Sequence, residues 1–436
     1  MKTNLREIVF WIVDGLRGGK IRKPYKDIKR IMSLPKEQLI IEQQHYLDKL
    51  IRHAKSTTSY YRMSLSGKEK IEDFPVINKN IIKDNYQEMQ SRAYKGKKLH
   101  YMTTSGSTGT PFTMMQDMGK RYRVLAELIY FNKFVGNNVG DKFIYFRVWT
   151  EKNKNSKLAQ IAKNMIPVDI LHFTDDTFEG IRQLLKKNSK ISAAIGYVST
   201  YEYLVRYLEK CGDSKDMFNI KTLITGSEIQ TPEIRNRLRD MFGCTVVSRY
   251  SNEENGVLAH QCIEHEEFHV NSANYIIEIL KMDSDEQADV GELGRVVVTD
   301  LFNYAFPIIR YDTGDLAIRC EKSLCGIGTD IITNIQGRKV DVIYDTKGNA
   351  LTPHTWSVYM WKYDKLSQYQ FIQDDAKDYL LKLNCDKELY DPEEIRNYMK
   401  NILGDDANIQ IEFVNEIPHL NSGKFKKTIC NYKRNV

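Results

Sequence analysis

The most informative segment of this chain is Thr103-Thr104-Ser105-Gly106-Ser107-Thr108-Gly109-Thr110-Pro111. Its small residues allow tight turns, and its backbone N–H groups and hydroxyls can together donate to a phosphate chain. Apolar-rich flanks at 99–102 and 112–116 predict two short strands joined by this loop. A Ser/Gly run can be a plain connecting turn, but the length of this one favours a triphosphate site. It is not a Walker A loop, because no Gly-Lys-Ser/Thr ending follows.

Length and composition set broad limits on the protein. A chain of 436 residues with 42% hydrophobic and 28% charged residues is typical of a soluble globular protein with two domains. The net charge of +7 is spread along the chain, which suits anionic small ligands. A nucleic-acid-binding protein would need a charge stripe or interleaved aromatic residues, and neither stands out.

The pattern of apolar residues predicts an α/β fold. Short apolar runs alternate with helical patterns, which is typical of a largely parallel sheet. The pattern changes to strands and turns after residue 271. Ser33 is expected to begin a helix over 33–54, and Thr231 with Pro232 to begin one that Gly243 ends. Further helices are predicted at 79–90, 120–134 and 201–210, and strands at 142–148, 191–197, 223–225, 244–248, 275–280 and 294–299.

Two polar clusters follow predicted strands, where ligands gather in open α/β sheets. The first is Gly226-Ser227-Glu228, and the second runs from Arg249 to Gly256. Glu253 is interpreted as a solvated surface residue. A carboxylate that faces a triphosphate, by contrast, would hold Mg²⁺.

Three further motifs follow in the second half of the chain. The segment 307–315 reads as a strand ending in Arg310-Tyr311, followed by an Asp-Thr-Gly-Asp turn. Its last residue, Asp315, could accept hydrogen bonds from both hydroxyls of a ribose. Gln336-Gly337-Arg338-Lys339-Val340-Asp341 comes next, and Pro418-His419-Leu420-Asn421-Ser422-Gly423-Lys424 lies near the C-terminus.

Five of these segments, namely the loop, the cluster from Arg249 to Gly256 and the three later motifs, resemble in this order those of the adenylate-forming superfamily, which contains acyl-CoA synthetases and peptide-synthetase adenylation domains. The resemblance implies a large N-terminal α/β domain over 1–336 and a small, mobile α+β domain over 337–436. It covers roughly residues 101–427. The family's Tyr-x-x-x-Glu, Tyr-x-Thr-Gly-Asp and Pro-x-x-x-x-Gly-Lys patterns all match. The family's hinge aspartate is Val340 here, which is a departure from the pattern.

Residue roles follow from this resemblance. Glu254 would contact Mg²⁺, Tyr250 would flank the adenine and Asp315 would bind the ribose. Lys424 would be the mobile catalytic lysine, whose charge aligns the substrate carboxylate with the α-phosphate. The implied ATP-binding set is Thr104, Ser105, Gly106, Ser107, Thr108, Gly109, Gly226, Ser227, Glu228, Tyr250, Ser251, Asn252, Asp315 and Arg338.

Within the superfamily the chain is most similar to phenylacetate–CoA ligase relatives, particularly the CapK-like capsule-biosynthesis branch. Some of these relatives bind a structural zinc, and the resemblance implies Cys262, His269, Cys320 and Cys325 as ligands here. The alternative interpretation is a scatter of free thiols and surface histidines. Seven cysteines and no recognisable signal peptide predict a reducing, cytoplasmic location.

The N-terminal segment suggests a membrane surface as a further partner. The apolar run 8–13 is too short to span a bilayer but, with the basic residues after it, could lie weakly on a membrane surface. A helix packed on the protein's own body is the favoured alternative. Nothing in the sequence settles the oligomeric state, although a dimer is compatible with it.

The sequence as a whole predicts an ATP-dependent ligase. A carboxylic acid and MgATP would form an acyl-adenylate, and the acyl group would pass to CoA or to an amine in capsular or surface polysaccharide biosynthesis. The alternative is a non-catalytic, nucleotide-binding subunit of a polysaccharide assembly complex. Intact Glu254, Asp315 and Lys424 favour the enzyme.

Overall fold

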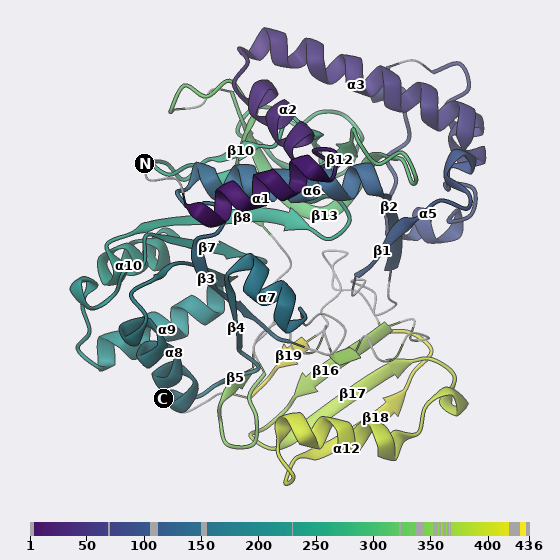
Figure 1. Ribbon diagram of the computed structural model, residues 1–436. Coiled ribbons are helices and arrows are strands. Elements are labelled where there is room, and N and C mark those ends of the chain that lie inside the picture. The colour runs from purple at the N-terminus through teal and green to yellow at the C-terminus, as the bar shows by residue number, and fades with distance from the viewer. Residues whose placement is uncertain are drawn as a thin grey trace.

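A computed structural model describes most of the chain (Figure 1). The described residues are 4–68, 70–104, 112–149, 155–228, 230–321, 324–336, 343–351, 356, 359–360, 363, 366, 368–417 and 428–432. Three predicted elements of the site lie outside them: the loop residues 105–109, Arg338 and Lys424.

One eleven-stranded sheet dominates the described part of the molecule. Neighbouring strands from β4 to β8 are parallel, and those from β8 to β11 are antiparallel. The predicted change in pattern after residue 271 reflects this switch. In order across the sheet the strands are β11 (Tyr275–Leu280), β12 (Leu293–Asp300), β13 (Ile308–Cys320), β14 (Ile331–Gln336), β10 (Phe268–Val270), β9 (Gly256–Gln261), β8 (Thr245–Asn252), β7 (Thr222–Gly226), β6 (Ile191–Tyr197), β3 (Lys142–Arg147) and β4 (Met165–Asp169).

Helices connect the parallel strands and bury a shared apolar core against them. The connecting helices are α7 (Lys157–Lys163), α8 (Asp175–Lys187), α9 (Val198–Lys210) and α10 (Pro232–Phe242). The predicted ends of α10 are confirmed: Thr231 accepts a hydrogen bond from the Ile234 N–H, and Gly243 adopts φ 59°. The core between α8, α9, α10 and the sheet includes Ile144, Phe146, Leu204 and Leu238.

The N-terminal region is helical and covers the antiparallel half of the sheet (Figure 1). The predicted helix at 33–54 begins at Lys36, after the extended Pro35. Ser33 instead ends the preceding helix, because its hydroxyl donates to the Arg30 carbonyl. The helices are α1 (Leu5–Leu16), α2 (Arg22–Met32), α3 (Lys36–Thr57), α4 (Ser59–Ser64), α5 (Lys79–Asp84) and α6 (Met118–Phe134), with single 3-10 turns at Ile71–Asp73, Arg92–Tyr94, Lys215–Met217 and Lys387–Leu389.

The strands predicted on either side of the glycine-rich loop are confirmed. Strands β1 (Leu99–Thr104) and β2 (Phe112–Asp117) pair antiparallel, with Thr104 opposite Phe112. Helix α5, predicted over 79–90, ends at Asp84, because the Asn85 side chain donates to the Ile81 carbonyl and the chain turns. Apolar residues of β2, α3, α5 and β13 share one core, so these elements hold each other in place.

The C-terminal part forms a second, smaller layer, drawn in yellow-green in Figure 1. Its four strands are β18 (Asn408–Phe413), β17 (Asp378–Asn384), β16 (Gln368–Gln373) and β19 (Thr428–Cys430), and helix α12 (Pro392–Leu403) packs on them. A two-stranded pairing of β15 (Ala350–Leu351) with β5 (His172–Phe173) joins this part to the large one. The fold is therefore α/β with a separate α+β C-terminal layer, as predicted. The division at residue 336 stays a prediction.

Candidate functional site

Glu254 lies at the centre of the candidate site, in the turn between β8 and β9. Its side chain is 4% exposed. Lys79 Nζ lies 2.8 Å from Glu254 Oε1, and the Tyr311 hydroxyl donates to the same oxygen at 3.2 Å. Residues from three distant parts of the chain therefore meet at one carboxylate.

A short pairing between the segment before α5 and strand β13 explains how Lys79 reaches Glu254. Ile77 bridges Tyr311 in parallel, through Ile77 N–H to the Arg310 carbonyl and Asp312 N–H to the Ile77 carbonyl, both 2.8 Å. Asn78 then caps α5 by accepting from the N–H groups of Asn80 and Ile81. Lys79 is thus the first residue of a helix whose start is fixed beside the site. No local sequence pattern indicated it.

The electrostatics of Glu254 keep it ionised. Burial raises the pKa of this carboxyl, but the Lys79 ammonium and the Tyr311 hydroxyl more than offset burial, so the pKa lies below its ordinary value. A buried carboxylate is an oxygen donor of the kind that Mg²⁺ takes, usually one or two per ion beside phosphate oxygens. The residues present therefore fit the predicted metal contact.

Tyr250 and Asp315, predicted to bind adenine and ribose, lie side by side. The Tyr250 hydroxyl donates to Asp315 Oδ2 at 2.9 Å and lies 3.3 Å from the Thr313 hydroxyl. The segment expected to turn after Tyr311 continues as strand β13 to Cys320, so the turn prediction is wrong. The strand is irregular here, because Gly314 has φ 79° and the register of pairing with β12 shifts opposite 295–297. Pairing with β12 continues on both sides of this shift.

The predicted adenine-side residues end strand β7 at the carboxyl edge of the parallel strands. Gly226 is opposite Arg249 across β7 and β8. Ser227 has φ 67° and turns the chain. The Glu228 carboxylate accepts from the Ser199 N–H at 2.6 Å and the Ser199 hydroxyl at 3.0 Å. Glu228 therefore holds the start of α9, a contact that its motif did not indicate, and burial raises its pKa to about 7.

The remaining predicted ATP-binding residues of this edge shape the turn that carries Glu254. Asn252 Oδ1 accepts from the Asn255 N–H at 2.9 Å. The register of pairing between β8 and β9 shifts between Tyr250 and Ser251. Ser251 itself is exposed. Gln116 of β2 donates to the Glu254 carbonyl at 3.3 Å. Strand β2, and with it the base of the glycine-rich hairpin, is thus attached to the same turn. Thr104 ends the other strand of that hairpin.

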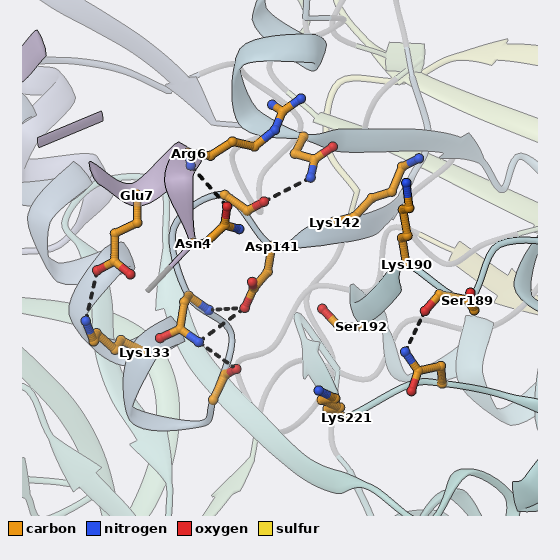
Figure 2. A pocket seen from close by; sticks show the side chains of 15 residues that line it. Asn4, Arg6, Glu7, Lys133, Asp141, Lys142, Ser189, Lys190, Ser192 and Lys221 are labelled. Carbon is orange, nitrogen blue, oxygen red and sulfur yellow. Dashed lines mark hydrogen bonds and ion pairs between the residues drawn. The ribbon is translucent and has the colours of Figure 1, made fainter. Parts of the chain in front are cut away.

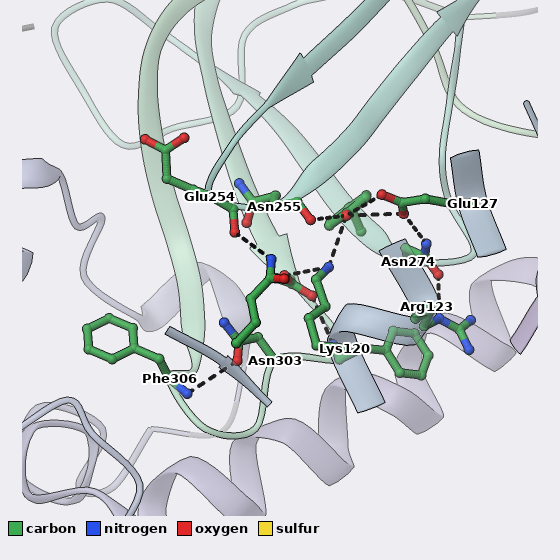
Figure 3. A network of polar contacts seen from close by, with 12 residues as sticks. Lys120, Arg123, Glu127, Glu254, Asn255, Asn274, Asn303 and Phe306 are labelled. Carbon is green, nitrogen blue, oxygen red and sulfur yellow. Dashed lines mark hydrogen bonds and ion pairs between the residues drawn. The ribbon is translucent and has the colours of Figure 1, made fainter. Parts of the chain in front are cut away.

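A buried polar network fixes the backbone just beyond Glu254 (Figure 3). Lys120 and Asp300 form an ion pair of 2.7 Å with both side chains 0% exposed. Lys120 also donates to the Tyr275 hydroxyl, which donates to the Asn255 carbonyl at 2.7 Å. Glu127 accepts from the Val257 N–H at 2.8 Å. These bonds hold the chain on both sides of Gly256.

Gly256 is required at this place in the network. Its φ is 129°, and a Cβ built there would collide with the Glu127 carboxylate. Glycine alone permits this close approach of backbone to a buried acid. The network was missed from the sequence, because its members come from five separate elements and each has an unremarkable local context.

Three of the four predicted zinc ligands come together. Ligand atoms of Cys262, His269 and Cys325 all lie within 4.8 Å of one another, with Cys325 Sγ 3.3 Å from His269 Nε2. Sulfur and imidazole donors at this separation suit tetrahedral zinc. Thr329 also contacts the other ring nitrogen of His269 at 3.3 Å.

Cys320 does not belong to this group, so the predicted four-ligand set is corrected. Ile331 of β14 is paired with Cys320 on one side and with His269 on the other. Cys320 is therefore two strand spacings from His269, roughly 10 Å. Its thiol lies instead 3.5 Å from the Thr333 hydroxyl.

Comparison with known proteins identifies the relationships of the chain. Residues 343–431 match the CapK C-terminal domain family. Protein CapK of Staphylococcus aureus is 24% identical over 94% of this chain and 92% of its own. The chain is a relative of CapK and of the phenylacetate–CoA ligases. The resemblance to the adenylate-forming superfamily drawn from the motifs is thereby confirmed.

Other comparisons agree with this relationship. Phenylacetate–coenzyme A ligase of Thermus thermophilus is 21% identical to this chain, over 78% of this chain and 79% of its own. The corresponding ligase of Pseudomonas putida is 22% identical, over 94% and 91%. A solved 2-hydroxyisobutyryl-CoA ligase, in complex with 2-HIB-AMP and CoA, superposes with a TM-score of 0.61 at 15% identity, over 93% and 92%. That likeness shows the shared fold. Among the described residues, no helix has the length and apolarity needed to cross a bilayer.

Proposed function

We propose that this protein is an ATP-dependent, adenylate-forming ligase. In the first step a substrate carboxylate oxygen attacks the α-phosphorus of ATP, and the bond to pyrophosphate breaks. In the second step a thiol or an amine attacks the acyl carbon, AMP leaves and the acceptor loses a proton. The observation that carries the proposal is the contact between two separate motifs: Tyr250 and Glu254 from one meet Asp315 and Tyr311 from the other.

The chain's own residues would bind and orient the nucleotide. Tyr250 would lie against the adenine, with its hydroxyl fixing Asp315 for the ribose hydroxyls. Glu254 would hold Mg²⁺, which supplies charge neutralisation at the phosphates. Lys424, brought in by the C-terminal part, would place its ammonium between the carboxylate and the α-phosphate.

The acceptor is proposed to be CoA, with an amine as the alternative, in a polysaccharide-related pathway. Support for CoA comes from the relatives named phenylacetate–coenzyme A ligase, and support for the pathway comes from CapK. The acyl group would lie near Tyr145 of β3 and Trp149 just after it, whose rings meet edge to face with centroids 5.5 Å apart.

Pyrophosphate release tests the proposal. MgATP is supplied with a panel of carboxylic acids, with CoA, with amines or with neither, and release that depends on one acid is expected. Acceleration by CoA or by an amine identifies the acceptor. Glu254→Gln should abolish release, whereas Glu264→Gln, on an exposed turn, should leave it unchanged. ATP binding without release, across a broad panel, would instead favour the non-catalytic subunit.

We also propose that Cys262, His269 and Cys325 hold a structural zinc, with a fourth ligand outside this trio. The support is their mutual distance, within 4.8 Å. Elemental analysis of the purified protein should find about one zinc per chain, which Cys262→Ser removes. Cys320→Ser and Cys211→Ser are matched controls that should retain the metal. A metal-free wild type would end this proposal and leave the adenylation proposal unaffected.

A further inference from the structure

Helix α1 is amphipathic, but its aliphatic side faces away from the protein rather than towards a core. Its aliphatic side chains face outward, and Leu16 is 85% exposed. At 100° per residue these side chains occupy a single stripe along the helix. The exposed aliphatic residues of α1 are Leu5, Ile8, Val9, Ile12, Val13 and Leu16.

The opposite, polar side of α1 packs on the protein and fixes this orientation. Glu7 is buried and pairs with Lys133 of α6 at 2.9 Å. Asp14 is buried and accepts from the N–H groups of Ile21 and Arg22 at 3.0 and 2.8 Å. Helix α1 therefore packs on the protein's own body, as favoured, but it does so through its polar side and leaves its aliphatic side facing outward.

A second element extends the apolar surface. Leu158 and Ile161 of α7 are also exposed. Arg6 of α1 donates to the Ile161 carbonyl at 2.9 Å, which places the end of α7 beside the first turn of α1. Exposed aliphatic side chains thus lie on two neighbouring helices.

A basic cavity of about 870 Å³ adjoins the first turn of α1, at the amino ends of the parallel strands (Figure 2). Five cationic residues line it, against the acids Glu7 and Asp141, and Glu7 is already paired with Lys133. The cationic residues are Arg6, Lys133, Lys142, Lys190 and Lys221.

We propose that α1 and this basic cavity form a docking surface for a bilayer that contains anionic lipids. The twelve residues of α1 are too few to cross a membrane, so the helix lies in the plane of the interface with its stripe among the acyl chains. The cavity receives phosphate-bearing headgroups. The basic residues that follow α1, including Arg17, Lys20 and Lys23, are exposed and add attraction.

Charge favours a bilayer over a second copy of the chain. A two-fold interface brings the same patch of each subunit together, so the cations around α1 of both subunits would gather in one interface. Like charges in contact oppose such pairing. An anionic lipid surface would bury the aliphatic stripe and neutralise the adjoining cations.

Vesicle sedimentation tests the aliphatic part. The full chain is mixed with vesicles of phosphatidylcholine and phosphatidylglycerol in equal amounts, and wild type should sediment with them. The double variant Val9→Gln/Ile12→Gln should bind at least roughly tenfold more weakly. The matched control is Met282→Gln/Val290→Gln, since Val290 and Val9 are both 51% exposed, and Met282 and Ile12 are 55% and 56% exposed. The control should bind like wild type.

A second set of variants tests the basic cavity. Lys190→Gln/Lys221→Gln should weaken binding by roughly fivefold per charge at low salt, and added salt should weaken binding of the wild type. Lys347→Gln/Lys387→Gln, two exposed lysines of the C-terminal part, should have no comparable effect. Vesicles of phosphatidylcholine alone should bind much less protein.

Two results would overturn the proposal. The first is failure of wild type to sediment with anionic vesicles. The second is a dimer in sedimentation equilibrium that Val9→Gln/Ile12→Gln converts to monomer, because the stripe would then be a subunit interface. Circular dichroism should confirm that each variant is folded. None of these measurements uses ATP turnover, so the proposed ligase activity is tested separately.

Discussion

Lys79 and Glu254 form an ion pair of 2.8 Å in which the glutamate is buried and the lysine side chain is 22% exposed. A cation of the protein therefore already neutralises the carboxylate that the motif assigns to Mg²⁺. The pair joins the start of α5 to the turn after β8, 175 positions apart in the sequence. The Lys79–Glu254 contact thus both assembles the candidate site and holds α5 against the turn after β8.

Lys79→Met should lower both stability and activity. It leaves a buried carboxylate without its partner, which costs about 3 kcal/mol of unfolding free energy. The pKa of Glu254 should also rise, because Lys79 lowers it in the wild type. The acid limb of the kcat/KM profile should then move to higher pH. Chemical denaturation and a pH–rate profile measure the two effects.

The control for this substitution is Lys83→Met on the same helix, whose charge does not contact Glu254. A further check follows from linkage. The depressed pKa of Glu254 contributes stability above its ordinary pKa of 4.5, and this is lost as pH falls through the folded-state value. The stability difference between wild type and Lys79→Met should therefore shrink in acid. Identical profiles for the two proteins would refute the role of the pair.

Glu228→Gln should become relatively more stable as pH rises. Burial raises the pKa of Glu228 from 4.5 to about 7, so its contribution is fullest below pH 4.5 and is lost as pH rises to about 7. The amide does not ionise. The variant should gain about 2 kcal/mol relative to wild type between pH 4.5 and 7.5, less than the full shift implies because the side chain is partly exposed.

Denaturant titrations at several pH values measure this difference. Glu233→Gln, in the first turn of α10, is a matched acid-to-amide control and should show no such trend. A pH-independent difference for Glu228→Gln would show that Glu228 stays ionised in the folded protein.

Tyr250→Phe should weaken ATP binding by way of Asp315. The substitution removes the 2.9 Å hydrogen bond that orients the Asp315 carboxylate, so KM for ATP should rise roughly fivefold, equivalent to about 1 kcal/mol. Asp315→Ala should raise KM more. In the double variant the two effects should not add, because both act through one carboxylate.

Tyr304→Phe is the matched control, since the Tyr304 hydroxyl is buried without a hydrogen-bond partner in the structure and lies outside the site. It should leave KM for ATP unchanged. Strict additivity of Tyr250→Phe and Asp315→Ala would mean that the two residues act independently.

Lys424→Ala should abolish adenylation while leaving ATP binding largely intact. The lysine is proposed to act on the reacting carboxylate and α-phosphate, so its loss removes charge stabilisation in the transition state. Single-turnover formation of acyl-adenylate, with ATP affinity measured separately, distinguishes the two effects. Lys426→Ala, two positions away, is the control. Turnover of Lys424→Ala equal to that of wild type would remove the assignment.

Local sequence was sufficient for the elements with strong periodicity and clear ends. The strands at 191–197 and 275–280 and the cap at Thr231 are examples. It failed at β13, where Asp-Thr-Gly-Asp has the composition of a turn but pairing with β12 keeps the strand extended. For α1 it indicated packing on the protein's own body, but an amphipathic pattern does not say which side meets the protein.

The sequence by itself determined the α/β class and the ordered motifs, because turn residues, caps and apolar periodicity act over a few neighbouring positions. Only the tertiary structure decided that Lys79 meets Glu254, that Glu228 holds α9 and that Cys320 lies apart from His269. Such contacts join residues far apart in the chain. They depend on strand register and on which side of each helix is buried, and no local pattern fixes either.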